Sequence, residues 1–201
     1  MPGRCIQMDL VSLSRESLKY CACPSSASYA VETYPVDHSI LAFIVGLLLA
    51  LLISSLMEYV VHRLMHKRIV LGQKHLEHHV EGTGQGWWGE FLDYFLPSLP
   101  FLWFGFFYSI AAGAGWFMGG FVYAIMAAYA HQVQHDNPDL VFWLNKPVHH
   151  LHHKGKMWHN NFGITFSFWD RIFVTYKDID WKPEKERRQY RLADYFQIQW
   201  F

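Results

Sequence analysis

The chain has 201 residues, a length that suits one domain, and 52% of them are hydrophobic whereas only 17% are charged. Its 17 basic and 17 acidic side chains cancel, and no stripe of Lys and Arg with interleaved aromatic residues occurs, so we exclude nucleic acid as a partner. The three cysteines are odd in number and form no CxxC pair, which argues against a disulfide framework or a cysteine metal site.

A polar N-terminal arm, residues 1–38, precedes the first apolar segment and contains no run long enough for the hydrophobic part of a signal peptide. Ser39–Met57 then runs for 19 residues without a charge. About 20 apolar residues are needed to cross a hydrocarbon layer of about 30 Å. We therefore predict a transmembrane helix here, with a buried helix of a soluble protein as the alternative.

A second uncharged segment, Tyr94–His135, has 42 residues without Asp, Glu, Lys or Arg. Glycines interrupt its middle, so we predict two short membrane segments joined by a turn near Gly113–Gly115. Each segment is short for a full crossing, and a hairpin that enters the bilayer without traversing it is the alternative.

The basic residues predict the orientation. Of the 17 Lys and Arg residues, 14 lie in Arg63–Lys74 or from Lys146 onward. The positive-inside rule places these segments on the cytoplasmic side of the ER or of a bacterial inner membrane. We therefore predict an all-α integral membrane protein. Its domain, residues 39–180, would have about three to four membrane helices and a cytoplasmic histidine-rich cap, followed by a cytoplasmic tail, residues 181–201.

Twelve of the 13 histidines fall in four clusters, several of them with HxxxH or HxxHH spacing. A helix turns 100° per residue, so these spacings place imidazoles on one helix face. Two crossings between the second and third clusters would bring all four to the same side of the membrane. The clusters are His62 and His66; His75, His78 and His79; His131 and His135; and His149, His150, His152, His153 and His159.

The number of imidazoles indicates two metal ions, because one zinc ion takes only three or four protein ligands. A single HxxxH pair is often an ordinary surface pair, but four clusters at membrane boundaries indicate a functional site. Imidazole binds iron, zinc and copper alike. Oxygen chemistry on an inert substrate needs a redox-active ion, which favours two iron ions, although zinc could replace them in a purified sample.

Five segments together resemble the fatty acid hydroxylase/sterol desaturase superfamily, and look closest to fatty acid hydroxylases. They are EYVVHRLMH (58–66), HLEHH (75–79), HQVQH (131–135), HHLHH (149–153) and NFGITFSFWDRIFVTY (161–176). The resemblance covers roughly residues 40 to 180. It implies a helical membrane fold with a cytoplasmic cap, two metal ions held by about ten histidines, and O2-dependent attack on a lipid C–H bond.

Carried over box by box, the resemblance implies ten metal ligands: His62, His66, His75, His78, His79, His131, His135, His149, His152 and His153. His150 and His159 are further candidates, as substitute ligands or as hydrogen-bond partners of ligands. The first box has three residues between its histidines where relatives often have four. No HPGG haem motif occurs, so we expect no haem in this chain. Electrons would come from a separate protein, a b-type cytochrome or a ferredoxin with its reductase.

Metal-bound histidines usually donate their second ring N–H to a carboxylate or a carbonyl. Glu58, Glu77, Asp136 and Asp170 are the candidate carboxylates. Glu58 is favoured because it lies four residues before His62, on the same helix face. Asp170 could equally pair with Arg171 or cap a turn. The metal centre itself is the only catalytic group that we predict.

Three alternatives stay open at this point. A sterol or lipid desaturase would use the same metal centre. A zinc transporter would need its ligands near the middle of the membrane, and a membrane cytochrome would leave most of these imidazoles unused. Among substrates, fatty acyl, sphingolipid, sterol and carotenoid chains are all compatible with the sequence, with a fatty acyl group favoured.

Overall fold

The computed structural model describes residues 38–181 and 190–201, and within these ranges all regular structure is helical, as predicted. The predicted N-terminal arm lies outside the described residues, apart from His38, where the first helix begins. In chain order the elements are α1 (His38–His66), α2 (Gly72–Glu81), α3 (Trp87–Ser98), η1 (Phe104–Phe107), α4 (Ile110–Asp136), η2 (Pro138–Leu140), α5 (Val148–Lys154), α6 (Phe168–Ile172) and η3 (Leu192–Phe196).

Helix α1 is one continuous helix of 29 residues, about 43 Å long, and it extends well beyond the predicted span. The predicted span and the HxxxH pair of the first box belong to the same helix. No proline or glycine lies between Met57 and His66, so nothing in the sequence stops the helix there. The helix therefore carries its two histidines out of the apolar segment on its last two turns.

The prediction of a turn near Gly113–Gly115 is wrong, because both glycines lie inside α4. The chain instead reverses between residues 99 and 109, and Ser109 caps α4 by accepting a hydrogen bond from the Ala112 N–H at 3.1 Å. A Cβ atom at Gly115 would meet the Phe43 carbonyl of α1. In membranes, small residues let two helices approach closely, and that is the role of these glycines.

A larger side chain at this contact is expected to force α1 and α4 apart. We expect Gly119→Val to destabilise the protein by about 3 kcal/mol, because its side chain would meet the backbone carbonyl of Leu47. Thermal unfolding of the protein purified in detergent measures the effect. Met118→Val is the matched control, since Met118 is exposed on the same helix. Equal melting temperatures for Gly119→Val and the wild type would contradict the close contact.

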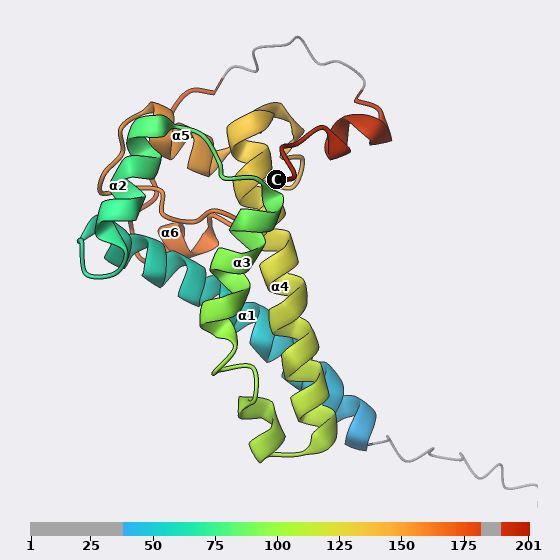
Figure 1. Ribbon diagram of the computed structural model, residues 1–201. Helices are drawn as coiled ribbons and strands as arrows, with labels where there is room; N and C mark the ends of the chain where they lie inside the picture. The colour runs from blue at the N-terminus through green and yellow to red at the C-terminus, as the bar shows by residue number, and fades with distance from the viewer. Residues whose placement is uncertain (1–37, 182–189) are drawn as a thin grey trace, which may run out of the picture. The chain divides into compact units, whose positions relative to one another are not determined.

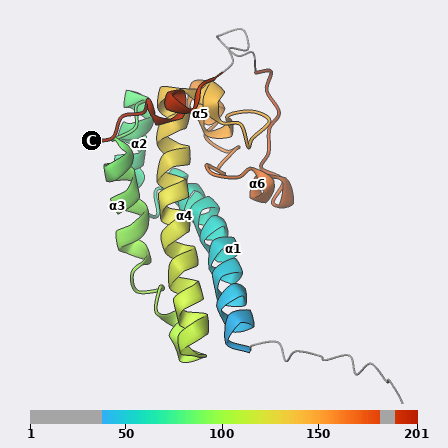
Figure 2. The same ribbon diagram turned by 90° about the vertical axis from the view of Figure 1, so that its right-hand side faces the viewer.

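Helices α1 and α4 lie side by side, and α3 packs along the other side of α4, as both views show (Figures 1 and 2). By length and composition, α1 and α4 are the two helices in the described ranges that could cross a membrane. Helix α3 has 12 residues and spans only about 18 Å. The return from α3 through η1 to α4 forms the predicted hairpin, with its turn displaced toward α3.

The short helices α2, α5 and α6 gather at the end of the molecule where α1 and α4 finish (Figure 1). The last described segment returns to this end: Ile198 is buried against Val133 of α4, and the Trp87 N–H donates to the Gln199 carbonyl at 2.8 Å. Residues 190–201 therefore pack against the start of α3 and against the end of α4, which carries His131 and His135.

Candidate metal centre

Five imidazoles from three helices direct their Nε2 atoms at one point. The central one is His66, whose Nε2 lies 2.8 Å from that of His152 and 2.9 Å from that of His75. All five ligand atoms lie within 4.8 Å of one another. This first group consists of His62 and His66 from α1, His75 and His79 from α2, and His152 from α5.

The spacing of these nitrogens is that of ligands around a cation. With metal–nitrogen bonds of about 2.1 Å, ligands 90° to 109° apart are separated by about 3.0 to 3.4 Å. The His66 Nε2 lies 3.2 Å from the Nε2 of His79 and 3.3 Å from that of His62. Five mutually facing lone pairs cannot be satisfied by hydrogen bonds among themselves, whereas one metal ion satisfies all of them.

A second group lies beside the first and draws on α2, α4 and α5. The Nε2 atoms of His135 and His149 are 3.2 Å apart, and the rings of His131 and His149 are centred 4.5 Å apart. The Nε2 of His78 is buried with no hydrogen-bond partner among the described residues. The group consists of His78, His131, His135 and His149, and its ligand atoms also lie within 4.8 Å of one another.

His153, the tenth predicted ligand, lies between the two groups. Its ring stacks on His79 of the first group at 3.9 Å between centroids, and is 4.6 Å from both His78 and His149 of the second. Both of its ring nitrogens are buried without a hydrogen-bond partner in the described part of the chain. A metal ion in either group would give this buried imidazole a partner.

Backbone carbonyls orient several of the rings through Nδ1. The Nδ1 of His62 lies 2.6 Å from the Phe162 carbonyl, and that of His152 lies 2.7 Å from the Asn160 carbonyl. In the second group, the Nδ1 of His135 is 3.1 Å from the Gly82 carbonyl. A carbonyl can only accept, so each Nδ1 carries the proton and each Nε2 presents its lone pair to the centre.

Glu90 of α3 holds the ring of His131, and the sequence analysis missed it. Its Oε2 lies 2.7 Å from the His131 Nδ1, and its Oε1 accepts a hydrogen bond from the Gln85 N–H at 3.1 Å. Burial alone would raise the pKa of Glu90, but the charge of His131 and the hydrogen bonds lower it to about 2. The sequence did offer one sign of this role, because Glu90 is the only charged residue in the apolar first turn of α3.

Neutralising Glu90 is expected to loosen the second group alone. We expect Glu90→Gln to weaken metal binding there by about 10- to 100-fold, because the amide no longer offers His131 a carboxylate acceptor. Metal retained per chain during titration with a chelator measures this. Glu81→Gln, the same exchange at an exposed residue, is the control. If Glu90→Gln kept both ions as tightly as the wild type, the orienting role would be refuted.

Four of the imidazoles in the two groups are held in their neutral form. Burial, aided by the charges of neighbouring imidazoles, lowers the pKa of His75 to about 2, of His79 to about 3 and of His78 to about 4. Burial also lowers the pKa of His152 to about 4. Metal ions bind neutral imidazole, so the site presents the required protonation state at neutral pH.

Glu58 binds a loop and does not hydrogen-bond His62, which corrects the expectation from the sequence. Its Oε1 accepts hydrogen bonds from the N–H groups of Ile164 and Thr165, at 2.9 and 3.0 Å. Its Oε2 accepts from the Thr165 hydroxyl at 2.6 Å and the Tyr123 hydroxyl at 3.0 Å. Because α1 turns Glu58 toward this loop, the carboxylate reaches His62 only through the loop backbone.

Asp170 also accepts hydrogen bonds from this loop. Its carboxylate accepts hydrogen bonds from the N–H groups of Phe162 and Gly163, at 2.8 and 2.7 Å, and from the Thr175 hydroxyl at 2.7 Å. Among the described residues Asp170 pairs with neither a histidine nor Arg171, and its hydrogen bonds to backbone N–H groups agree with the alternative, a carboxylate that caps a turn. Two buried carboxylates thus fix four consecutive N–H groups, residues 162–165, in the segment whose Phe162 carbonyl orients His62.

The other two candidate carboxylates also point away from the histidines. Glu77 is exposed on the outer face of α2 and accepts a hydrogen bond from Gln73 at 3.0 Å. Asp136 accepts from the Gln132 amide at 2.9 Å and from the Gln199 N–H at 2.7 Å, and so anchors the last described segment to α4. Neither hydrogen-bonds a histidine, because each lies on a helix face directed away from both groups.

His150 and His159 belong to neither group. The Nδ1 of His150 lies 3.1 Å from the Gln134 carbonyl, and its ring packs edge-on against Trp181. One residue along α5 from His149, it is turned by 100° away from the centre. His159 is exposed in the loop after α5.

Comparison with protein families gives one match. The model of a family described as fatty acid hydroxylase matches residues 47–175, which is well over half of the chain and contains both histidine groups and the loop that orients them. Comparisons with curated proteins and with solved structures give no match.

Proposed function

The chain belongs to the fatty acid hydroxylase family, part of the fatty acid hydroxylase/sterol desaturase superfamily, and on this premise we propose that it is a membrane-bound di-iron enzyme that hydroxylates a lipid hydrocarbon chain. Membership makes it an oxidoreductase of the hydroxylase and desaturase type. With its two long apolar helices, the chain is a membrane protein.

The observation that carries the proposal is the pair of adjoining histidine groups, with His153 between them. Nine imidazoles in two groups supply the donors for two ions, and imidazole suits iron. Bound iron would supply the reduction of O2 and the oxidising power that removes hydrogen from a methylene. The protein lowers the pKa of several of these imidazoles, which keeps them neutral, and fixes the orientation of others through backbone carbonyls.

The reaction defines the partners that we propose. Hydroxylation of R–H by O2 gives R–OH and water only if two electrons and two protons are supplied. We propose that these electrons come from a separate b-type cytochrome, or from a ferredoxin with its reductase. The basic residues near the histidine-bearing end favour the cytoplasmic side of the ER or of a bacterial inner membrane for this exchange.

A lipid or sterol desaturase is the second candidate, because removal of a second hydrogen from the substrate would use the same centre. Zinc transport is less well supported. A transport path needs ligands near the middle of a membrane helix, but His62, His66, His131 and His135 lie in the last turns of α1 and α4.

The test uses the full chain, purified in detergent from iron-supplemented cells and given O2, a reductant and fatty acyl lipids. Mass spectrometry is expected to find a product one oxygen atom heavier than the substrate, formed only with both O2 and reductant. A product two hydrogens lighter would identify a desaturase. Metal-loaded protein that consumed no O2 with any lipid offered would contradict both oxygenase assignments.

A further inference from the structure

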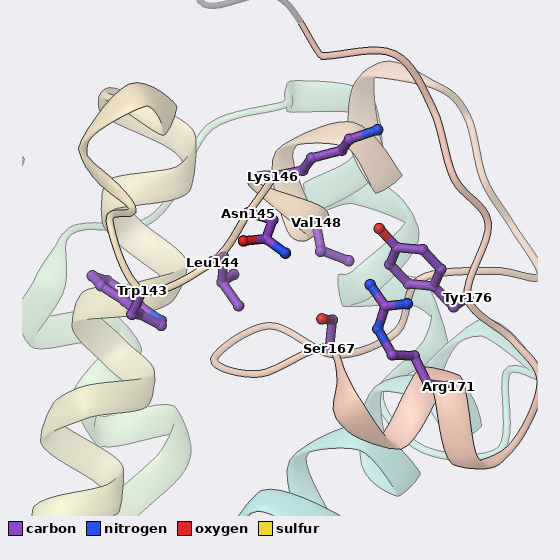
Figure 3. Close-up of a pocket in the computed structure, with 8 residues that line it drawn as sticks. All are labelled: Trp143, Leu144, Asn145, Lys146, Val148, Ser167, Arg171 and Tyr176. Atoms are coloured by element: carbon purple, nitrogen blue, oxygen red, sulfur yellow. The ribbon is translucent and has the colours of Figure 1, made fainter.

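A small cavity of about 150 Å³ lies between the loop that precedes α5 and the start of α6 (Figure 3). The proposed oxygenase chemistry assigns no role to it. Its walls combine apolar side chains with groups that can donate hydrogen bonds. The lining residues are Trp143, Leu144, Asn145, Lys146, Val148, Ser167, Arg171 and Tyr176.

The polar groups of this cavity favour an anion. In Figure 3 the Arg171 guanidinium, the Ser167 hydroxyl and the Asn145 amide face a common space. Arg171 stacks on the Tyr176 ring, 3.9 Å from its centroid, and no carboxylate in residues 38–181 or 190–201 forms an ion pair with it. Stacking leaves the edge of the guanidinium, where its N–H donors lie, available to a ligand.

The second cation of the cavity is already compensated. The Lys146 Nζ lies 2.6 Å from the Asp178 carboxylate and donates to the Ile179 carbonyl at 2.7 Å. None of the residues that line the cavity is acidic, and Arg171 is the lining cation without an ion pair among the described residues. A planar guanidinium with neighbouring hydroxyl and amide donors matches the oxygens of a phosphate group.

The position of α6 indicates where such a phosphate would come from. The Trp169 indole N–H donates to the Ser55 hydroxyl of α1 at 3.0 Å, and the Phe173 ring stacks on Tyr59 with centroids 5.2 Å apart. Ser55 lies in the last turn of the uncharged run, and Tyr59 lies two residues beyond its end at Met57. Helix α6 therefore lies at the level where the hydrocarbon of a bilayer would give way to head groups.

The apolar side chains around Arg171 are exposed. Ile172 retains 60% of its surface and Val174 retains 88%, and Phe168 is also exposed. Exposed apolar residues are costly in water, as is an arginine that has no ion pair within residues 38–181 and 190–201. Both suit a membrane surface, where the chains of a lipid cover the apolar residues and its phosphate meets the cation.

We propose that this cavity binds the phosphate of a membrane phospholipid, with the lipid chains lying over Phe168, Ile172 and Val174. This site uses none of the ten predicted metal ligands, so it does not depend on the oxygenase assignment. Free inorganic phosphate shares the anion chemistry but cannot cover the apolar residues, and this difference makes the lipid source testable.

The test is thermal unfolding of the full-length protein in detergent, titrated separately with dioctanoyl phosphatidic acid, dioctanoylglycerol and inorganic phosphate. We expect phosphatidic acid alone to raise the melting temperature in a saturable way. Arg171→Gln is expected to weaken this response at least about tenfold, by loss of a charge-assisted contact. Arg191→Gln, which removes an exposed arginine elsewhere, should leave it unchanged.

Ser167→Ala supports the same test if Arg171→Gln folds poorly, because the Ser167 side chain makes no capping hydrogen bond with α6; we expect it to weaken the response severalfold. An equal response to dioctanoylglycerol would reduce the site to an apolar surface and overturn the proposal. An equal response to inorganic phosphate would overturn the lipid source. A full response in both Arg171→Gln and Ser167→Ala would overturn the cavity as the site.

Discussion

Replacing His66 or His135 by alanine is expected to lower the metal content of the purified protein from about two ions per chain to about one. His66 is the central residue of the first group, with its Nε2 within 3.3 Å of four others. His135 contributes to the second group, where its Nε2 lies 3.2 Å from that of His149. Each substitution removes a donor from one group and leaves the other complete.

Activity should respond more strongly than metal content. If both ions act together on O2, each variant is expected to lose about 100-fold or more of its turnover, although one ion stays bound. Total metal per chain and lipid product are measured on the same preparations, and thermal unfolding reports whether the fold is retained. His38→Ala is the matched control, because this histidine is exposed at the start of α1 and belongs to neither group.

Two results would contradict this arrangement. Unchanged metal content in both variants would return the histidines to a structural role. Loss of all metal from His66→Ala, with the melting temperature unchanged, would show one shared site in place of two groups.

The convergence of the histidines could be predicted from the sequence, because helix geometry determines which of them share a face. HxxxH and HxxHH spacings place side chains on one face of any helix, whatever the helix packs against. The outer members of the second box, His75 and His79, accordingly share the first group. That His78 would instead join the second group does not follow from spacing, since it depends on how α2 lies between α1 and α4.

The hairpin turn was predicted wrongly because glycine has two uses. In water, several glycines weaken a helix, so the cluster from Gly113 to Gly120 predicts that the helix is interrupted there. Against a second helix, the same residues allow close backbone contact, and the gain from packing α1 on α4 offsets their low helix propensity. One sequence without its partner surface does not distinguish these two cases.

The carboxylates could not be assigned because their partners are distant in the chain. Glu58 binds N–H groups more than 100 residues further on, and Glu90 reaches His131 from another helix. The short distance from Glu58 to His62 along α1 suggested a direct contact. The loop at residues 162–165 offers two N–H groups instead, and a buried carboxylate is stabilised best by such donors.

Glu58 and Asp170 hold the loop at residues 162–165 through different sets of hydrogen-bond donors. Asp170→Asn is expected to be far more damaging than Glu58→Gln, although both exchange a buried carboxylate for an amide of the same shape. Each oxygen of Asp170 faces a backbone N–H, one from Phe162 and one from Gly163. Whichever way the amide is turned, its NH2 group meets a donor, and a buried N–H loses its acceptor.

Glu58 differs in that only Oε1 faces N–H groups, while Oε2 faces the hydroxyls of Thr165 and Tyr123. A hydroxyl can accept as well as donate, so the Gln amide can donate where the carboxylate accepted. We expect Asp170→Asn to cost about 3 kcal/mol and Glu58→Gln about 1 kcal/mol.

A measurement of metal binding distinguishes a loop that orients His62 from a loop that only stabilises the fold. Misplacing the Phe162 carbonyl frees the ring of His62, so Asp170→Asn should weaken the first group by about 10- to 100-fold while the second group keeps its ion. Chelator titration together with thermal unfolding measures both quantities. Equal losses of stability from the two variants would show that the direction of each hydrogen bond does not matter here. If Asp170→Asn lost stability but still bound both ions as tightly as the wild type, the reason for assigning the loop an orienting role would be removed.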